Sequence, residues 1–248
     1  MLFLINLDSA VERRTAMAQQ LELLGLHFER VGVDLRCVRA GEVDAQINSR
    51  FPGLHFDRKT LSNAEIGCWL SHLSAWQALL HSNEEFCTVI EDDLRLAPDF
   101  AHAMRALASR ARREARFDLV YLGTSSRNVS QRMRTEIDRF AVHRPVGVIF
   151  NTWGYSISRG YAERLLQHGS RRIRLPIDHY LGGRGGRARP YIGVLQPTVV
   201  EEDPVLGPAS QIGPYTKRLD RSPWFQSLRR RILSSAASEL YYSLYRWL

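Results

Sequence analysis

The sequence predicts an α/β fold with a nucleotide-binding layer that opens with a βαβ unit. Three observations support this prediction. The chain opens with a strand–helix–strand pattern, apolar runs alternate with helical patterns further along, and a triplet of carboxylates directly follows one apolar run. The chain has 248 residues, of which 44% are hydrophobic and 24% are charged, so it can bury a sizeable core.

The opening pattern begins with a strand and a helix. Residues 2–7 are strongly apolar, as a buried parallel strand is, and a helix is predicted from there to about Leu24. Asp8 or Ser9 can cap the start of this helix, and Gly25 stops it.

The remaining elements are predicted by the same criteria. Strands are predicted at 28–33, 87–90, 117–122, 146–150, 155–157 and 191–195, and helices at 63–80, 98–111 and 160–167. Asp34 follows the second strand, where an acidic residue favours nucleotide binding by a βαβ unit. Ser62 or Asn63 caps the helix at 63–80. Residues 36–63 and 124–144 are predicted to be irregular, the first as a mobile loop beside the active site.

The net charge and the cysteine content indicate which kinds of partner and which cellular compartment to expect. A formal net charge of +8 and a pI near 9.8 favour a polyanionic partner, such as nucleic acid, anionic lipid or a phosphorylated substrate. Three cysteines without metal or disulfide spacing favour a reducing compartment. The N-terminal run reads as a strand and not as a signal peptide, and no apolar run is long enough for a transmembrane helix.

The carboxylate triplet Glu91-Asp92-Asp93 is the first candidate site. Side chains alternate along a strand, so Glu91 and Asp93 are predicted to share one side, with Asp92 facing away. Two carboxylates at the carboxyl end of a strand suit a divalent cation that holds a diphosphate. The alternative is a solvated acidic turn. A phosphatase nucleophile motif is disfavoured, because Arg95 stands where that motif has threonine.

Three further segments carry candidate residues that also have structural explanations. Glu65 and His72 share a face of the helix at 63–80. Taken alone, they are better explained by a glutamate that favours the helix dipole and a histidine in a satisfied polar contact. The pair Asp178-His179 can supply an acid or base, or simply cap a helix. The glycine-arginine run at 181–187 lacks the Lys-Ser/Thr of a P-loop and predicts a flexible loop, with Arg184 or Arg187 near a ligand phosphate.

The C-terminal tail is basic and amphipathic. Five of the eight net positive charges lie from Tyr215 onward, and apolar residues recur there every four positions beside tyrosines and tryptophans. We expect this tail to contact an anionic membrane surface. The alternative is a terminal helix packed on the core or on a second subunit.

Eight segments in a fixed order resemble glycosyltransferase family 25, the lipooligosaccharide-biosynthesis galactosyltransferase-like proteins. They lie between about residues 2 and 200 and read LINLDSAVERR, FERVGVD, LSNAEIGCWLSHLSAWQ, VIEDDLRLAPDF, FDLVYLG, NTWGYSISRGYAERLL, PIDHYL and VLQPTVV. The resemblance implies a GT-A-like, Rossmann-type nucleotide-binding sheet flanked by helices at 1–203. The basic amphipathic helical extension predicted at 204–248 is not part of the resemblance. The resemblance also implies a UDP-sugar donor and a divalent metal, Mn²⁺ or Mg²⁺.

The resemblance also assigns roles to residues. Asp93 becomes the metal ligand, and Glu91 contacts the metal or the ribose. Asp178 becomes the catalytic base, with Glu201 or Glu202 as substitutes. The other expected contacts to the nucleotide sugar or its site are Asp8, Arg13, Arg14, Asp34, Glu65, Gly67, Ser71, His72 and Asp92.

Two positions depart from the family pattern. Residues 31–35 read Val-Gly-Val-Asp-Leu where the family often has Asp-Ala-Val-Asp-Gly, so only Asp34 is retained. Asn151 stands where the family has glycine before a Thr-x-Gly/Ala-Tyr segment.

The function implied by the resemblance is a metal-dependent, inverting transfer of a hexose, galactose or glucose, from a UDP-sugar to a lipooligosaccharide-type acceptor. It would act at the cytoplasmic face of the inner membrane. A non-catalytic relative that binds carbohydrate or a partner is the alternative. Nucleic acid is not an expected partner, because only charge and the glycine-arginine run favour it.

Overall fold

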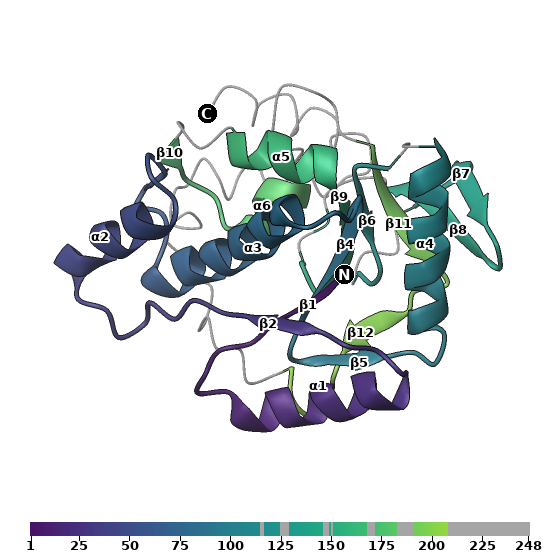
Figure 1. Cartoon of the computed structure of the whole chain (residues 1–248), viewed down its shortest axis with the longest axis horizontal. Helices are drawn as coiled ribbons and strands as arrows, with labels where there is room; N and C mark the ends of the chain where they lie inside the picture. The colour runs from purple at the N-terminus through teal and green to yellow at the C-terminus, as the bar shows by residue number, and fades with distance from the viewer. Residues whose placement is uncertain are drawn as a thin grey trace, which may run out of the picture. The chain divides into compact units, whose positions relative to one another are not determined.

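One mixed sheet organises the described part of the chain (Figure 1). The computed structural model describes residues 1–114, 117–124, 129–145, 149, 151–167, 172–182 and 191–207. The strands of the sheet are β1 (Leu2–Ile5), β2 (Glu29–Val31), β4 (Phe86–Glu91), β6 (Leu119–Tyr121), β7 (Val129–Ile137), β8 (Phe140–Pro145), β9 (Gly154–Ser158) and β11 (Ile192–Gln196). They lie in the order β2-β1-β4-β9-β6-β11-β8-β7.

The strand directions bring several strand ends to one edge. β1 runs parallel to β2 and β4, and β6 runs parallel to β11. β9 lies between β4 and β6 and is antiparallel to both. The carboxyl ends of β1, β4 and β6 therefore meet the amino end of β9 at the same edge, which is where open α/β sheets bind ligands.

Helices cover both faces of the sheet (Figure 1). They are α1 (Val11–Leu23), α2 (Ala40–Arg50), α3 (Asn63–His81), α4 (Phe100–Glu114), α5 (Arg159–Gln167) and α6 (Ile177–Gly182). The hydrophobic core follows the same division. Phe3, Val89 and Tyr121 belong to one buried cluster with residues of α3 and α5, whereas Leu4 and Ile90 belong to another with residues of α1 and α4.

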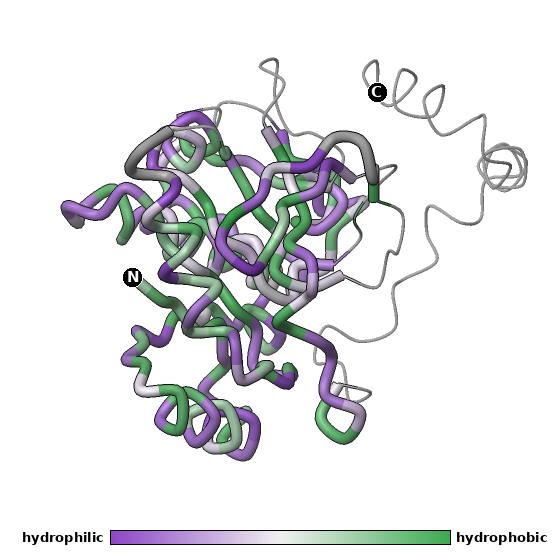
Figure 2. The backbone as a smooth tube through the Cα atoms, turned by 90° about the vertical axis from the view of Figure 1, so that its right-hand side faces the viewer, coloured by the Kyte–Doolittle hydropathy of each residue, from purple (hydrophilic) through white to green (hydrophobic). Residues whose placement is uncertain are grey.

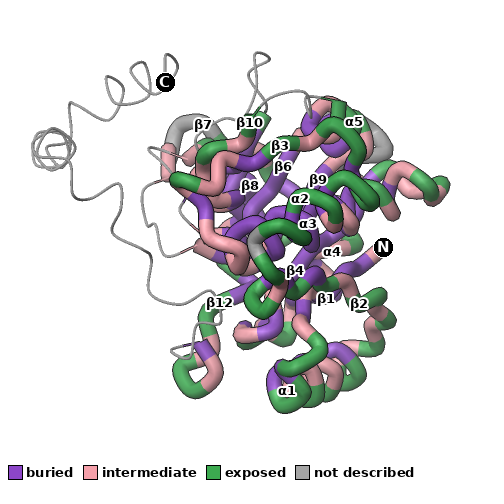
Figure 3. Tube along the Cα trace, turned by 90° about the vertical axis from the view of Figure 1, so that its left-hand side faces the viewer, coloured by how far each residue is buried: buried purple, intermediate pink, exposed green. Residues whose placement is uncertain are grey.

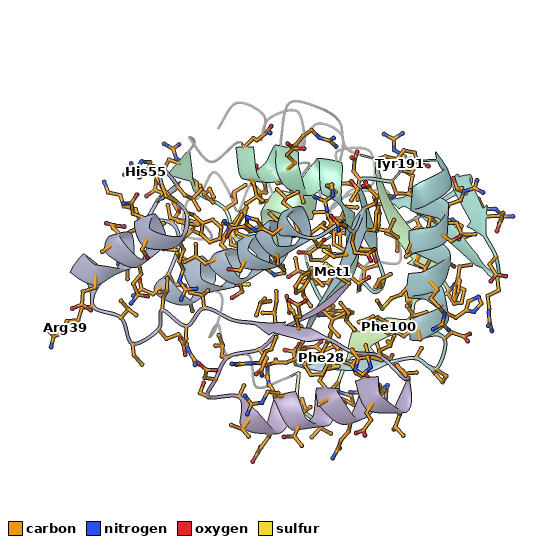
Figure 4. The ribbon with its side chains drawn as sticks, in the orientation of Figure 1. Met1, Phe28, Arg39, His55, Phe100 and Tyr191 are labelled. Carbon is orange, nitrogen blue, oxygen red and sulfur yellow. The ribbon has the colours of Figure 1, made fainter. Side chains whose placement is uncertain are left out.

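This alternation of neighbouring strand residues between two clusters is the period-two pattern of a sheet buried on both faces. β1 and β4 are buried along most of their length (Figure 3), and side chains fill the space between the sheet and its helices (Figure 4). The predicted α/β class is confirmed.

Local sequence signals set the amino end of α3 and the carboxyl end of α1, as predicted. The predicted cap at the amino end of α1 is not formed. Ser62 caps α3 in a capping box with Glu65, as expected. Gly25 ends α1 with a positive φ of 66°, in the hydrogen-bond pattern of a Schellman motif. The predicted cap of α1 is wrong, because the N-cap residue is Ala10 and no side chain caps it. Asp8 is instead paired with Arg30.

Helix α1 buries some of its apolar residues and leaves the apolar residues at its two ends exposed. In Figure 2, it lies at the bottom of the view and mixes hydrophobic with hydrophilic residues along its length. Met17 and Leu21 are buried in one core cluster with Leu4 of β1, while Val11 and Leu23 are exposed.

The two segments predicted to be irregular contain regular structure. Residues 36–63 contain α2 and the short strand β3 (His55–Phe56), and Val43 and Ile47 of α2 are buried in the core. Residues 124–144 contain most of the antiparallel pair β7 and β8. Both predictions were wrong because the few apolar side chains of these segments acquire their burial only from neighbours distant in sequence.

Two small pairs of strands complete the described fold. β3 pairs with β10 (Arg172–Ile173), and β5 (Leu94–Leu96) pairs with β12 (Val200–Glu202). The second pair matters for the site, because it places residues 203–207 beside the acidic triplet: the Asp203 amide donates to the Asp93 carbonyl at 2.9 Å.

Several predictions fall outside the described residues. Of the strand predicted at 146–150 only Ile149 is described, and Arg184, Arg187 and the tail beyond residue 207 are not. The chain divides into two units, Met1–Ala209 and Ser210–Leu248, and only the first contains described residues. None of the described helices combines the length and apolar character needed to cross a membrane.

Candidate active site

The acidic triplet lies at the edge where the strand ends meet. β4 ends at Glu91, and Asp92 and Asp93 follow it in a bend. Asn6 follows β1, and Thr152 precedes β9. The side chains of Asn6 and Thr152, from two neighbouring strand ends, contact the triplet directly.

Asp92 faces the interior, which corrects the prediction that it points away from Asp93. Its carboxylate accepts a hydrogen bond from the Asn6 amide at 2.6 Å and another from the Arg13 guanidinium at 3.1 Å. Arg13 is itself buried, and it also donates to Asp93 at 3.2 Å and to the Leu206 carbonyl at 2.7 Å. The prediction failed because the strand, and with it the alternation of side chains, ends at Glu91.

Asp93 is only partly compensated. One carboxylate oxygen contacts Arg13, whereas Oδ1 is buried and has no hydrogen-bond partner from another residue in the described ranges. Burial raises the pKa of Asp93 to about 6, although the positive charge of Arg13 opposes the rise. A buried carboxylate oxygen without a partner is costly unless a ligand or a cation contacts it.

The side chain of Glu91 points toward α3. The hydroxyl of Thr152 donates to its Oε1 at 2.5 Å, and Nε2 of His72 lies 3.9 Å from the same oxygen. Burial, followed by the negative charge of Asp93, raises the pKa of Glu91 to about 8. Glu91 therefore holds its proton more tightly than an exposed glutamate does.

The residues of α3 predicted to line the site mostly serve its packing. Glu65 accepts hydrogen bonds from both the amide and the hydroxyl of Ser62 in the capping box. The Ser71 hydroxyl accepts from the Val33 amide at 2.9 Å and donates to the Gly67 carbonyl. Direct contact of Glu65 or Ser71 with a nucleotide sugar therefore stays a prediction, while their structural roles are visible.

His72 is the exception on this helix. Its ring is fully buried, it stacks on Tyr155 with centroids 5.6 Å apart, and burial lowers its pKa to about 3. The ring is thus neutral at physiological pH. Its Nε2 faces Glu91, and direct contact of His72 with a nucleotide sugar stays a prediction.

Asp178 lies at the start of α6 and is electrostatically linked to the triplet. Its Oδ1 accepts a hydrogen bond from the His179 amide at 2.7 Å, and burial raises its pKa above the ordinary value. Its negative charge contributes to the raised pKa of Glu91. The charges of Glu91 and Asp178 both add to the effect of burial in raising the pKa of the Cys68 thiol, so these acids face a common region.

The other predicted contacts lie further from this region or are already paired. The side chain of Asp8 is 88% exposed and forms an ion pair with Arg30 at 2.6 Å. Asp34 pairs with Arg36, whose hydrogen bond lowers the pKa of Asp34. Arg14 is half-buried on α1.

The two proposed substitutes for the base are also exposed. Glu201 pairs with Arg95 across β12 and β5 at 2.6 Å. Glu202 is exposed on β12, and its charge contributes to the raised pKa of Asp93. Asp178 acts electrostatically on Glu91 and is less exposed than either, so Asp178 is the better candidate for a base.

The side chains at this edge suit a metal ion coordinated by both the protein and a bound substrate better than one coordinated by the protein alone. In the described ranges, no group of three or more His, Cys, Asp or Glu side chains is arranged to hold a metal ion. Glu91 and Asp93 supply at most two ligands, and Asp93 offers a buried oxygen without a partner. Mg²⁺ sites often use one or two carboxylates and take their other oxygens from phosphates and water. Glu91 and Asp93 therefore fit a metal ion that takes its remaining ligands from phosphates and water.

Comparison with known proteins agrees with this geometry. Residues 1–181 match the model of glycosyltransferase family 25, described as an LPS biosynthesis protein. The chain belongs to glycosyltransferase family 25. The match includes the triplet, α3 and Asp178.

Curated members of family 25 are similar over the same region. The chain is 32% identical over 184 residues to a glycosyltransferase 25 family member of Anopheles gambiae. It is 29% identical over 185 residues to procollagen galactosyltransferase 1 of Danio rerio and 27% identical over 189 residues to procollagen galactosyltransferase 2 of Homo sapiens. These matches cover 73%, 72% and 73% of this chain but only 31%, 30% and 29% of the relatives. The chain thus matches about three tenths of their length.

Sequence reasoning missed four residues that the fold of this family 25 chain brings to the triplet. They are Asn6, Thr152, Tyr155 and Leu206, which contact Asp92, Glu91, His72 and Arg13 respectively. Asn6, Thr152 and Tyr155 lie in the segments LINLDSAVERR and NTWGYSISRGYAERLL, which carry the family resemblance, so that resemblance was the available signal. Leu206 contributes its backbone carbonyl, and a backbone contact cannot be predicted from the type of residue.

Proposed function

We propose that this chain transfers a hexose from a UDP-sugar to a saccharide acceptor. One observation carries the proposal: the acids at the carboxyl edge of the sheet, Glu91 and Asp93, are partly buried and only partly compensated, and the partly buried Asp178 is electrostatically linked to them. A fold by itself stabilises such a cluster of carboxylates poorly. A divalent cation that also binds the phosphates of a ligand offsets their negative charge. Membership of family 25 supports the same reading.

Each residue has a defined task in this proposal. Arg13 and Asn6 hold Asp92 in place, and Arg13 also orients Asp93. Asp93 and Glu91 would hold Mn²⁺ or Mg²⁺. When bound, the metal would supply positive charge that stabilises the diphosphate leaving group. The expected GT-A-like arrangement of the nucleotide site is part of this proposal.

Asp178 is the proposed general base. Burial raises its pKa, which makes its carboxylate a stronger base than an exposed aspartate. In an inverting transfer, the acceptor hydroxyl gives its proton to this carboxylate as its oxygen bonds to C1 of the sugar. The bond from C1 to the diphosphate breaks at the same time, and no covalent enzyme intermediate is needed.

The names of relatives favour galactose as the transferred hexose, because several are galactosyltransferases, with glucose as the alternative. For the acceptor, the family description favours a lipopolysaccharide-type saccharide, and the procollagen relatives offer a protein-borne acceptor as the alternative. We propose the lipid-linked acceptor at the cytoplasmic face of the membrane, since the basic tail from Tyr215 complements an anionic surface.

The proposed transfer is tested by screening UDP-sugars for UDP release with Mn²⁺ and candidate acceptors. We expect Asp178→Asn to reduce turnover by about 10³-fold or more while Mn²⁺–UDP binding is retained. Asp44→Asn, at an exposed acid of α2, is the matched control and should leave turnover unchanged. Turnover of Asp178→Asn at the wild-type rate would remove Asp178 from the base role.

The non-catalytic alternative has a different signature. A chain that binds Mn²⁺–UDP or a saccharide, yet releases no UDP with any donor and acceptor, would be a binding protein that keeps the fold. Wild-type turnover with a single donor would exclude that alternative.

The membrane proposal is tested separately with vesicles. The full chain should sediment with vesicles rich in anionic lipid, and less so as salt is raised, because the attraction is screened. A chain ending after Gly207 should remain soluble beside the same vesicles. Equal binding by the two chains would contradict a role for the tail.

A further inference from the structure

His72 belongs to a buried chain of polar groups that leads from the core of the protein to Glu91. Nε1 of Trp76 donates to the Tyr155 hydroxyl at 2.9 Å, and the same hydroxyl lies 2.7 Å from Nδ1 of His72. On the other side of the ring, Nε2 lies 3.9 Å from Oε1 of Glu91. Trp76, Tyr155 and His72 are fully buried.

The contacts of Tyr155 determine the direction of these hydrogen bonds. An indole Nε1 can only donate, so the Tyr155 oxygen accepts from Trp76 and still has its own proton to place. Nδ1 of His72 is the acceptor within reach among the described contacts of this hydroxyl. If Nδ1 carried the proton instead, a buried tyrosine proton would be left without a partner, which is costly. Nδ1 is therefore bare, and in the neutral ring Nε2 carries the proton.

The Nε2–H group faces Glu91 and has no hydrogen-bond partner in the described part of the chain. At 3.9 Å it is too far from Oε1 for a hydrogen bond, but a movement of about 1 Å brings the two atoms into range. Glu91 is the last residue of β4, and its side chain is 25% exposed, so that side chain has room to adjust. Contacts of this kind often tighten only when the ligand is bound.

We propose that His72 is a positioning residue: Trp76 and Tyr155 hold its ring in the Nε2–H tautomer, which directs a hydrogen-bond donor at the Glu91 carboxylate. Thr152 donates to the same carboxylate from the opposite strand. The two donors orient Glu91 and leave its remaining lone pairs for a cation. The part of this inference that concerns the cation rests on the proposed function.

The tautomer is measured directly by ¹⁵N NMR of the metal-free chain with labelled histidine. The chain has eight histidines, and the resonances of His72 are assigned by their loss in His72→Gln. We expect Nδ1 to resonate as a bare nitrogen and Nε2 as a protonated one. The opposite pattern, with Nδ1 protonated and Nε2 bare, would overturn the inference, and it would mean that a protonated Glu91 donates to His72.

Tyr155→Phe tests the relay while it keeps the ring stacking. It should disturb the tautomer of His72 and weaken Mn²⁺–UDP binding by about tenfold, as changes to residues behind metal ligands commonly do. Tyr121→Phe is the matched control. It removes a buried hydroxyl that has no hydrogen-bond partner in the described ranges, from a ring that packs edge-on to Tyr155. Equal effects of the two substitutions would contradict the relay.

Substitution of His72 itself separates positioning from packing. In His72→Gln the side-chain amide can reach the place of Nε2, whereas in His72→Asn it reaches only the place of Nδ1. We expect Gln to retain Mn²⁺–UDP affinity better than Asn, by about fivefold or more. Equal losses would indicate a purely structural role. Absence of Mn²⁺–UDP binding in the wild type would instead contradict the proposed function, and the tautomer of the metal-free chain would still decide the inference.

Discussion

Glu91, Asp92 and Asp93 are neighbours in the sequence, yet each meets different surroundings. Asp92 is satisfied by Asn6 and Arg13. Asp93 shares Arg13 but keeps one buried oxygen without a partner in the described ranges, and Glu91 is held by Thr152. The pKa of Glu91 and of Asp93 is raised, so the metal-free fold favours their protonated forms.

The raised pKa of Glu91 predicts a pH-dependent stability. The folded pKa is about 8, against an ordinary value of 4.5, so the folded chain binds this proton more tightly than the unfolded chain does. The corresponding stabilisation is fully present below pH 4.5 and is lost as the pH rises through 8. Without metal, Glu91→Gln should exceed the wild type in free energy of unfolding at pH 9 by about 2 to 4 kcal/mol.

Urea denaturation from pH 5 to pH 9 measures this difference. Glu201→Gln, at an exposed acid paired with Arg95, is the control and should follow the wild-type profile. A parallel profile for Glu91→Gln would show that Glu91 is ionised at little cost. Addition of Mn²⁺ and UDP should raise the stability of the wild type more than that of Glu91→Gln.

At the scale of elements, α3 is the helix on which the site depends. It carries His72, and its amino-terminal half packs against the segment that follows β2, where the Ser71 hydroxyl accepts from the Val33 amide. This close approach requires glycine at position 67, because a Cβ there would lie 2.5 Å from the Val33 carbonyl oxygen.

We therefore predict opposite effects for two glycine-to-alanine substitutions. Gly67→Ala should destabilise the chain by about 2 to 3 kcal/mol, because backbone atoms must move apart. Gly41→Ala, in α2 with open space around the added methyl group, should be neutral or stabilising by about 0.5 kcal/mol. Thermal unfolding of the two variants checks the comparison, and a neutral Gly67→Ala would contradict the packing described.

The carboxyl end of α3 is held by an arginine from another element. The Arg159 guanidinium, at the start of α5, donates to the carbonyls of Leu79, Leu80, Ser82 and Glu84. These carbonyls belong to the last turn of α3 and the residues after it, several of which have no partner within the helix.

Arg159→Met should cost about 2 to 4 kcal/mol of stability, since several carbonyls lose a charged donor. Arg95→Met, at an exposed ion pair with Glu201, should cost less than about 1 kcal/mol. Denaturant titration at neutral pH separates these outcomes. Similar small losses in both variants would show that water replaces Arg159 at little cost.

At the scale of the whole described unit, the reversal of β9 creates the site. Because β9 runs against β4 and β6, its amino end carries Thr152 to the edge where β4 delivers Glu91. The pairing of β12 with β5 adds residues 203–207 to the same edge, where the Leu206 carbonyl accepts from Arg13.

This contact predicts where the described unit can be cut. The boundary suggested by the sequence, after Asp203, removes the Leu206 carbonyl from the buried Arg13. A chain ending after Asp203 should be less stable than one ending after Gly207 by about 1.5 to 3 kcal/mol. Equal stability of the two truncated chains in urea would contradict a structural role for residues 204–207.

The sequence by itself determined the α/β class, the positions of β1, α3, β4 and α5, and the family resemblance that includes the triplet and Asp178. These features follow from local information, since hydrophobic periodicity, capping residues and glycine stops act within a few residues. The same local rules failed for α2 and for β7 and β8, whose few apolar residues are buried by distant neighbours.

Only the tertiary structure decided how the site is assembled. In the folded chain, Asp92 pairs with Arg13, and Tyr155 contacts His72. Glu65 and Ser71 take part in the capping and packing of α3. Hydrogen bonds between residues about 80 positions apart, such as that between Asn6 and Asp92, depend on strand order and direction. Strand order is set by the packing of the complete sheet, and no local pattern encodes it.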